Sequence, residues 1–101
     1  LGVLSYQGLG IIQDYKEAAK WFLRAAELEN SEAQYKMGLM FQGGFGLPQD
    51  YVKAHMWFNL AGAGGHTEAI RGRDKLAENM KASEIQEAQR LAREWSGSQT
   101  R

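Results

Sequence analysis

Two histidines and two glycine-rich segments have the clearest chemical potential in this 101-residue chain. His55 and His66 lie eleven positions apart without a neighbouring set of metal ligands, so their spacing predicts no metal site. The glycines at 8–10 and 43–46 could form phosphate-binding loops, but no predicted strand precedes them and no Lys-Ser/Thr pair follows. Carboxylates are abundant, yet none is placed by sequence in an apolar setting that suits a catalytic acid. We therefore expect no catalytic residue, no metal and no cofactor.

The charge pattern argues against a nucleic-acid or anionic-membrane partner. Lys and Arg number 12 and Asp and Glu also number 12, so the chain has no net charge and no long-range field. One basic run is interrupted by acids: its bases are Arg71, Arg73, Lys75 and Lys81, and its acids are Asp74 and Glu78. A solvated, locally paired helix face is the favoured interpretation of this run. The chain has no cysteine and no apolar run of about 18 residues, so we expect a soluble protein without disulfides or a membrane span.

The elements that position these residues repeat with a period of 36. Gln13-Asp14-Tyr15 recurs at 49–51, and Trp21-Phe22 recurs at 57–58. Laying residues 1–33 over 37–69 gives 12 identities in 33 positions, whereas average composition would give roughly two. Leu1 aligns with Met37, inside a helix of the next copy, which favours a piece of a longer array.

Capping residues and apolar spacing predict that every element is helical. The capping box at 31–34 predicts a first helix, A, that ends near Gln42, where glycines and Pro48 follow. Asp50 predicts the N-cap of a second helix, B, that ends near 64–65. A third A helix is predicted to begin at Thr67, and a last helix to run from a capping box at 83–86 to about Trp95.

We therefore expect an all-α fold, an α/α superhelix (solenoid) of antiparallel helix hairpins with a C-terminal capping helix. One domain would cover residues 1–101: a partial first repeat (1–30), a second repeat (31–66), C-terminal capping helices (67–95) and a tail (96–101). The last helix would bury Ile85, Ala88, Leu91, Ala92 and Trp95 and present charged residues to water, as a terminal cap requires.

The repeated unit resembles the Sel-1-like repeat, a relative of the tetratricopeptide repeat. It is carried by Met37-Gly38, Gly44-x-Gly46, Gln49-Asp50-Tyr51 and Ala54-x-x-Trp57-Phe58 with the closing Ala61, and by their counterparts from residue 1 onward. The segment 73–95 looks like the closing part of many bacterial members. Ser5 and Gly62 depart from the usual aromatic and Ala. The resemblance implies a solenoid that serves as a protein-interaction scaffold without catalysis.

The repeated small and aromatic residues predict one continuous core in which matching positions have matching surroundings. These core positions are Gly2, Tyr15, Ala18, Trp21, Phe22, Gly38, Tyr51, Ala54, Trp57 and Phe58.

A second stripe on the A helices faces away from that core and predicts a concave binding surface for a protein or peptide. It comprises Tyr35, Leu39 and Gln42, with Val3 and Tyr6 one period earlier and Glu68, Arg71, Lys75 and Glu78 one period later. An alternative for Tyr35 is a half-buried packing role.

The alternative to a scaffold is a structural or assembly role. In this role the N-terminal end around Leu1, Val3 and Leu4 would mediate the formation of a homo-oligomer. A small hydrolase is the least favoured hypothesis. The sequence leaves the compartment open between the bacterial cytoplasm and export, and it does not identify the partner.

Overall fold

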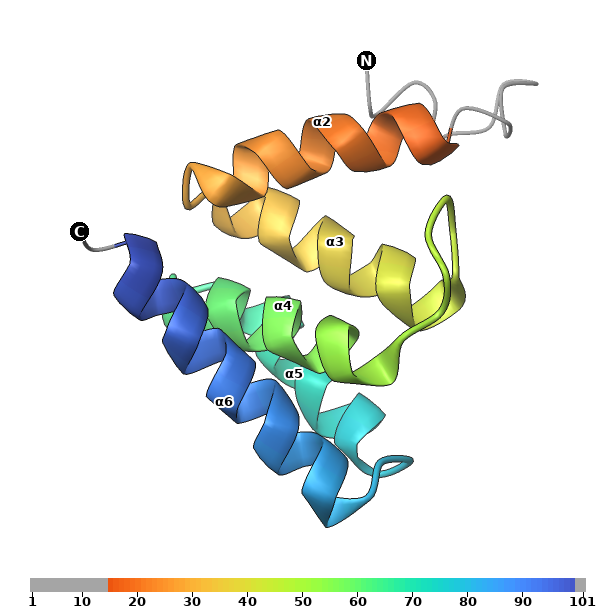
Figure 1. Cartoon of the computed structure of the whole chain (residues 1–101), viewed down its shortest axis with the longest axis vertical. Helices are drawn as coiled ribbons and strands as arrows, with labels where there is room; N and C mark the ends of the chain where they lie inside the picture. Colours follow the sequence, from red (N-terminus) through yellow and green to blue (C-terminus); the bar gives the residue numbers. More distant parts are fainter. Residues whose placement is uncertain (1–14, 100–101) are drawn as a thin grey trace.

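The computed structural model describes residues 15–99, and the secondary structure in this range is entirely α-helical (Figure 1). Its helices are α2 (Tyr15–Glu27), α3 (Ser31–Gly43), α4 (Tyr51–Ala63), α5 (Thr67–Ala77) and α6 (Ala82–Gln99). The predicted all-α class is confirmed. Gly2, Val3 and Tyr6, together with Leu1 and Leu4, lie outside the described residues.

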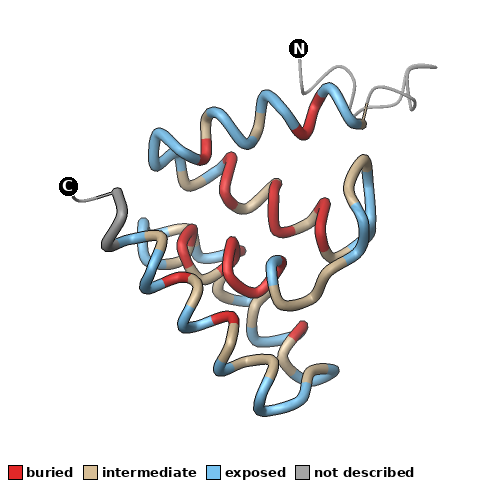
Figure 2. The backbone as a smooth tube through the Cα atoms, in the orientation of Figure 1, coloured by how far each residue is buried: buried red, intermediate tan, exposed pale blue. Residues whose placement is uncertain are grey.

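Successive helices stack as the solenoid prediction requires. α2 packs on α3, α3 packs on α4, and α4 packs on both α5 and α6. α4 is therefore the central helix, and the buried residues are concentrated on α3 and α4 (Figure 2). Within residues 15–99 no helix is both long enough and apolar enough to cross a membrane.

The boundary between α3 and α4 follows the sequence signals closely. Gly44 adopts a left-handed conformation (φ 73°) and its N–H donates to the carbonyl of Met40, which closes α3. The carboxylate of Asp50 accepts from the N–H of Lys53 at 3.1 Å, so the predicted N-cap of α4 is confirmed.

The capping box predicted at the start of α3 was wrong by one residue. The N-cap is Asn30, whose side-chain oxygen accepts from the N–H of Ala33 at 2.9 Å. The hydroxyl of Ser31 instead donates to the carbonyl of Gly64, and the amide of Gln34 donates to the carbonyl of Ala26. Both side chains are used for contacts between helices, which local sequence cannot show.

α6 differs from its prediction at both ends. It begins at Ala82, one residue before Ser83, and the carboxylate of Glu84 accepts from the N–H of Lys81 at 2.8 Å just before the helix. It continues to Gln99, one turn past the predicted end, since no proline follows Trp95 to stop it. The predicted inner face is confirmed in Ala88 and Ala92, which are buried.

The core is built largely from the repeated positions. Ala18, Gly38, Ala54, Trp57 and Phe58 are buried, and Tyr15, Phe22 and Tyr51 are partly buried. The ring of Phe58 is fully buried beside Gly38, where even a Cβ atom would overlap its Cδ1 and Cε1. Small residues on α3 therefore allow α4 to approach closely.

The prediction that Trp21 and Trp57 share matching core surroundings was wrong. Trp57 is 3% exposed and its ring lies edge-on to Trp95 of α6, with centroids 4.9 Å apart, whereas Trp21 is 49% exposed. The residue one period before Trp95 is Asn59, whose short side chain has no ring to offer. Moreover, α2 packs mainly on α3 and not closely on α4, so the contact that buries Trp57 has no counterpart at Trp21.

Candidate functional site

The stripe predicted to face away from the core is exposed on α5 but only partly so on α3, where Tyr35 and Leu39 pack against the core cluster. On α3, Tyr35, Leu39 and Gln42 are half-buried, whereas Glu68, Arg71 and Lys75 on α5 and Glu78 directly after it are exposed. We call these seven residues the A-helix face. Val3 and Tyr6, which the prediction placed on the same surface, lie outside the described residues.

Tyr35 is fixed in place by two aromatic neighbours. Its ring stacks on the imidazole of His66 with centroids 4.5 Å apart and an interplanar angle of 23°, and it lies 5.7 Å from the ring of Phe58. The ammonium of Lys36 lies 5.9 Å from the Tyr35 ring centroid. The packing role considered for Tyr35 is thus present, and its half-buried ring lies where α3 meets the start of α5.

His66 links the two A helices through both of its ring nitrogens. Its Nδ1 accepts from the N–H of Ala69 at 3.1 Å and so caps α5. Since Nδ1 is the acceptor, the neutral ring carries its proton on Nε2, which donates to Oε1 of Glu32 at 2.7 Å. The other carboxylate oxygen of Glu32 lies 3.7 Å from the ammonium of Lys36. The result is a charged and aromatic cluster beside the predicted stripe.

Sequence reasoning missed the contributions of Glu32, Lys36 and His66 to this surface. A signal was nevertheless present, because His66 stands one full period after Asn30, the residue that caps α3. Both side chains accept from the N–H of an alanine three residues on, Ala33 or Ala69. Matching slots therefore do share a role here, although the residue types differ.

The basic run on α5 is locally paired in part. The guanidinium of Arg73 donates to Asp74 at 3.0 and 3.1 Å and to the side-chain oxygen of Asn59 on α4 at 3.1 Å. His55, 3% exposed, lies in α4, and burial lowers its pKa below 6.5; Arg73 lowers the pKa further and Asp74 opposes that effect. No group of three His, Asp or Glu side chains in the part of the chain that the structure describes could hold a metal ion.

Comparison with known proteins places these features in a family. The Sel1 repeat model matches residues 1–30 and 31–66. No curated protein matches the chain.

Two solved structures resemble the fold. The crystal structure of a protective antigen present in uropathogenic Escherichia coli strains, which displays an SLR fold, matches with a TM-score of 0.87 and 31% identity over 94% of this chain and 21% of that one. A Sel1 repeat protein from Oxalobacter formigenes matches with a TM-score of 0.70 and 29% identity over 93% of this chain and 41% of that one. The chain therefore spans about a fifth and two fifths of the lengths of these two proteins.

Proposed function

The chain belongs to the Sel1 repeat family, and from this premise we propose that it is a non-catalytic adaptor that binds a protein or peptide on its A-helix face. Sel1 repeats generally mediate protein–protein interaction and generally act as non-catalytic scaffolds.

The observation that carries the proposal is the fixed aromatic edge of Tyr35 between α3 and α5. A ring already held by His66 and Phe58 loses little conformational freedom on binding, and such preorganised aromatic side chains make effective anchors. The exposed charges of α5, among them Arg71 and Lys75, belong to the same proposed face and are groups that can select a complementary partner.

Site-specific cross-linking tests the location. A photoreactive residue replaces Gln42 on the A-helix face, and in a control it replaces Gln89, which is exposed on α6. We expect a partner protein to be captured from position 42 and not from position 89. Equal capture from both positions would exclude the A-helix face as the binding surface.

A charge substitution then tests the interaction with the captured partner. Arg71→Glu changes an exposed residue of the face, and Arg93→Glu makes the same change on α6. We expect Arg71→Glu to weaken binding about tenfold, largely through the association rate, and Arg93→Glu to leave it unchanged. Binding that is insensitive to Arg71→Glu, or equally sensitive to both changes, contradicts the proposal.

Self-association is a second candidate, because two large apolar side chains are exposed on α2 and directly after it. Trp21 is 49% exposed and Leu28 is 83% exposed, and burial against a second copy would remove both from water. Light scattering across a concentration series tests this candidate, with the double variant Trp21→Lys and Leu28→Lys expected to dissociate any dimer. A strictly monomeric parent chain at high concentration excludes it.

A further inference from the structure

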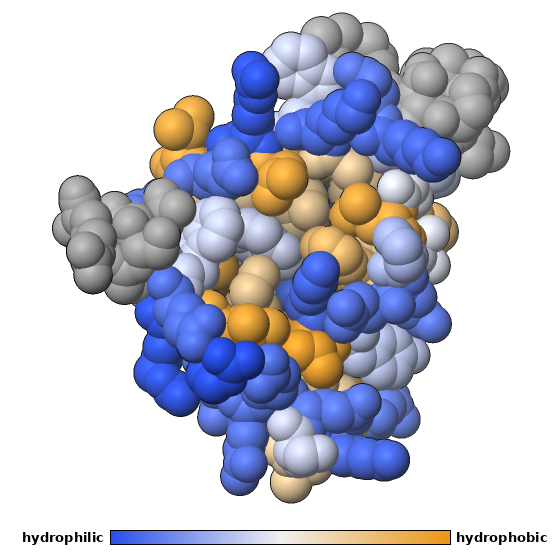
Figure 3. All heavy atoms as spheres, viewed as in Figure 1, coloured by the Kyte–Doolittle hydropathy of each residue, from blue (hydrophilic) through white to orange (hydrophobic). Residues whose placement is uncertain are grey.

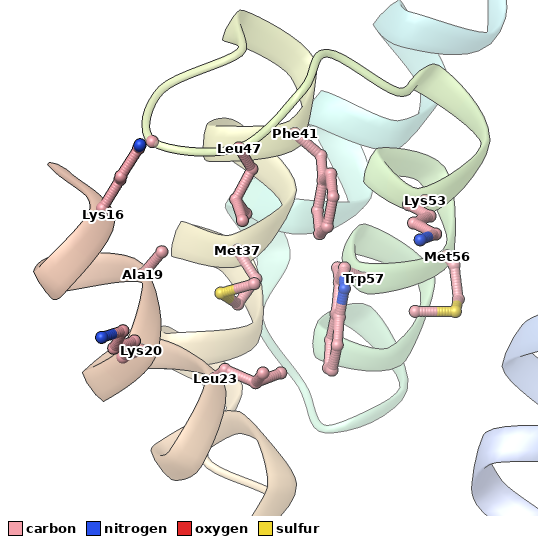
Figure 4. Close-up of a pocket in the computed structure, with 11 residues that line it drawn as sticks. Lys16, Ala19, Lys20, Leu23, Met37, Phe41, Leu47, Lys53, Met56 and Trp57 are labelled. Carbon is pink, nitrogen blue, oxygen red and sulfur yellow. The ribbon is translucent and has the colours of Figure 1, made fainter.

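An apolar groove lies between helices α2 and α4, and none of the described residues that line it belongs to the A-helix face. It has a volume of about 500 Å³, within the range of roughly 300–1,000 Å³ that is typical of binding pockets. Its floor is formed by Leu23, Met37, Phe41, Leu47, Met56 and Trp57. Figure 3 shows apolar residues gathered between α2 and α4, and Figure 4 shows Leu23, Met37, Phe41, Leu47 and Trp57 between the two helices, with Met56 projecting from the other side of α4.

The groove exists because the two B helices α2 and α4 do not close on each other as α4 and α6 do. On α4, Leu60 is buried in the same hydrophobic cluster as Ala92 of α6, and α4 packs on α6. One period earlier, α2 has Arg24 in the position of Leu60 and Lys20 in the position of Met56, and both are exposed. Two charged, exposed residues of α2 thus stand where α4 has two buried apolar ones, and α2 does not pack closely on α4.

Lysines border the apolar floor on two sides. Lys16 and Lys20 lie one turn apart on α2, and Lys53 lies across the groove on α4 (Figure 4). The ammonium of Lys53 is 5.7 Å from the ring centroid of Phe41, so its stem covers part of the floor. The ammonium of Lys20 lies 3.9 Å from the carboxylate of Glu17, and both side chains are exposed. Because water screens such an ion pair strongly, most of the positive charge of Lys20 stays available to a ligand.

Among residues 15–99, those that line the groove include three lysines and no Asp or Glu. The ligand that complements this lining therefore has an apolar body and negative charges at its edges. The apolar floor disfavours a nucleic-acid backbone, which would leave the floor uncovered. A groove open along two helices matches an amphipathic helix better than a small enclosed molecule.

We propose that the α2–α4 groove binds an acidic amphipathic segment of a partner protein, with large apolar side chains at positions i, i+3 or i+4 and i+7 seated on the floor and Asp or Glu beside the lysines. This second docking site is independent of the A-helix face, so the failure of either proposal leaves the other standing.

Selection from a random 15-residue peptide library on the purified chain tests the proposal and requires no identified partner. Selected peptides are expected to combine large apolar residues at helical spacing with an excess of Asp and Glu. Their binding should weaken as salt is raised. A library that yields no binders, or binders without an acidic excess, overturns the proposal.

Matched variants locate the binding of the selected peptides. Leu23→Asp changes a floor residue that is 37% exposed, and Leu28→Asp makes the same change directly after α2 and outside the groove. We expect Leu23→Asp to lower the affinity for the selected peptides at least about tenfold and Leu28→Asp to leave that affinity unchanged. Equal effects of the two variants would refute a site in the groove. Thermal melts check that each variant is folded.

The charge requirement has its own control pair. Lys16→Gln with Lys53→Gln removes charge from both sides of the groove, whereas Lys81→Gln with Arg93→Gln removes the same charge from exposed positions outside both the groove and the A-helix face. We expect about a tenfold loss of peptide affinity in the first pair alone. Phosphatidylglycerol vesicles serve as the competing probe. Vesicle binding that the first pair abolishes, without peptide binding, would assign the groove to a lipid surface and overturn the proposal.

Discussion

Alanine at Gly38 should destabilise the protein even though alanine is the better helix former. A Cβ at this position would overlap Cδ1 and Cε1 of Phe58 and lie 3.1 Å from its Cγ. The Phe58 ring is fully buried and cannot move outward, because Gly72 lies on another side of it and Tyr35 is 5.7 Å away. The overlap must therefore be relieved by moving α3 away from α4.

The magnitude follows from two opposing effects. Overpacking of this kind costs up to about 3 kcal/mol, while replacing glycine by alanine in a helix interior returns about 1 kcal/mol. We expect a net loss of about 2 kcal/mol in the free energy of unfolding for Gly38→Ala. Gly72 provides the matched control, since a Cβ there would make ordinary contacts of 3.4 and 3.5 Å with the same Phe58 ring. Gly72→Ala should be neutral or stabilise by up to about 1 kcal/mol.

Urea unfolding followed by far-ultraviolet circular dichroism measures both variants, with the slope used to check that the transition remains two-state. A Gly38→Ala variant as stable as the parent, or equal midpoint shifts for the two alanine variants, would refute the overlap as the cause. A double variant with Phe58→Leu separates the cause further. If the overlap is responsible, the shorter side chain should reduce the cost of Gly38→Ala by more than about 1 kcal/mol.

The remaining predictions concern Trp57, Trp21, His55 and His66. Trp57→Ala should cost about 3–5 kcal/mol and Trp21→Ala less than about 1 kcal/mol in urea unfolding, because only Trp57 is buried; similar costs would contradict the difference in their surroundings. Burial, and to a smaller extent Arg73, lowers the pKa of His55 in the folded chain below 6.5. Just below pH 6.5 the unfolded chain therefore binds more protons at this residue than the folded chain does. The free energy of unfolding should accordingly be highest above pH 6.5 and fall as the pH drops through that value. Urea unfolding at about pH 7.5 and about pH 5.5 should show this fall, and a His55→Gln variant with the same fall would exclude His55 as its source. His66→Ala should lose about 1 kcal/mol in thermal unfolding through the α5 cap, whereas His66→Asn should retain most of it; equal losses would show that the cap contributes nothing.

Much of the fold could be predicted from the sequence because its signals act locally. Asp50 caps α4 and Gly44 ends α3 through hydrogen bonds that span only three or four residues. The core positions Ala54, Trp57 and Phe58 are recognisable because helical spacing and a matching set one period earlier agree. Helical periodicity also indicates which residues of α5 are exposed, whereas Tyr35 and Leu39 on α3 pack partly against the core; the role of the A-helix face in binding stays a proposal.

Contacts between distant residues limit such prediction. Ser31 is predicted to cap its own helix, but its hydroxyl lies near Gly64 and bonds there instead. The cluster of Glu32 and His66 depends on side chains 34 residues apart, and the repeat pattern does not state which residue types will meet. The wrong prediction for Trp21 has the same origin, because the burial of this side chain depends on the residues of the next B helix, α4, and on how closely that helix packs on α2.

A helical repeat of 36 residues can be read directly from the chain, since caps, glycine breaks and apolar spacing act over a few residues and recur at matching positions. How closely each pair of helices packs emerges only in the folded molecule. Trp57 is buried against Trp95, whereas α2, with Lys20 and Arg24 exposed, leaves an open groove beside α4. Such outcomes depend on the shape and charge of side chains brought together only by folding, so two copies of one motif acquired different surroundings.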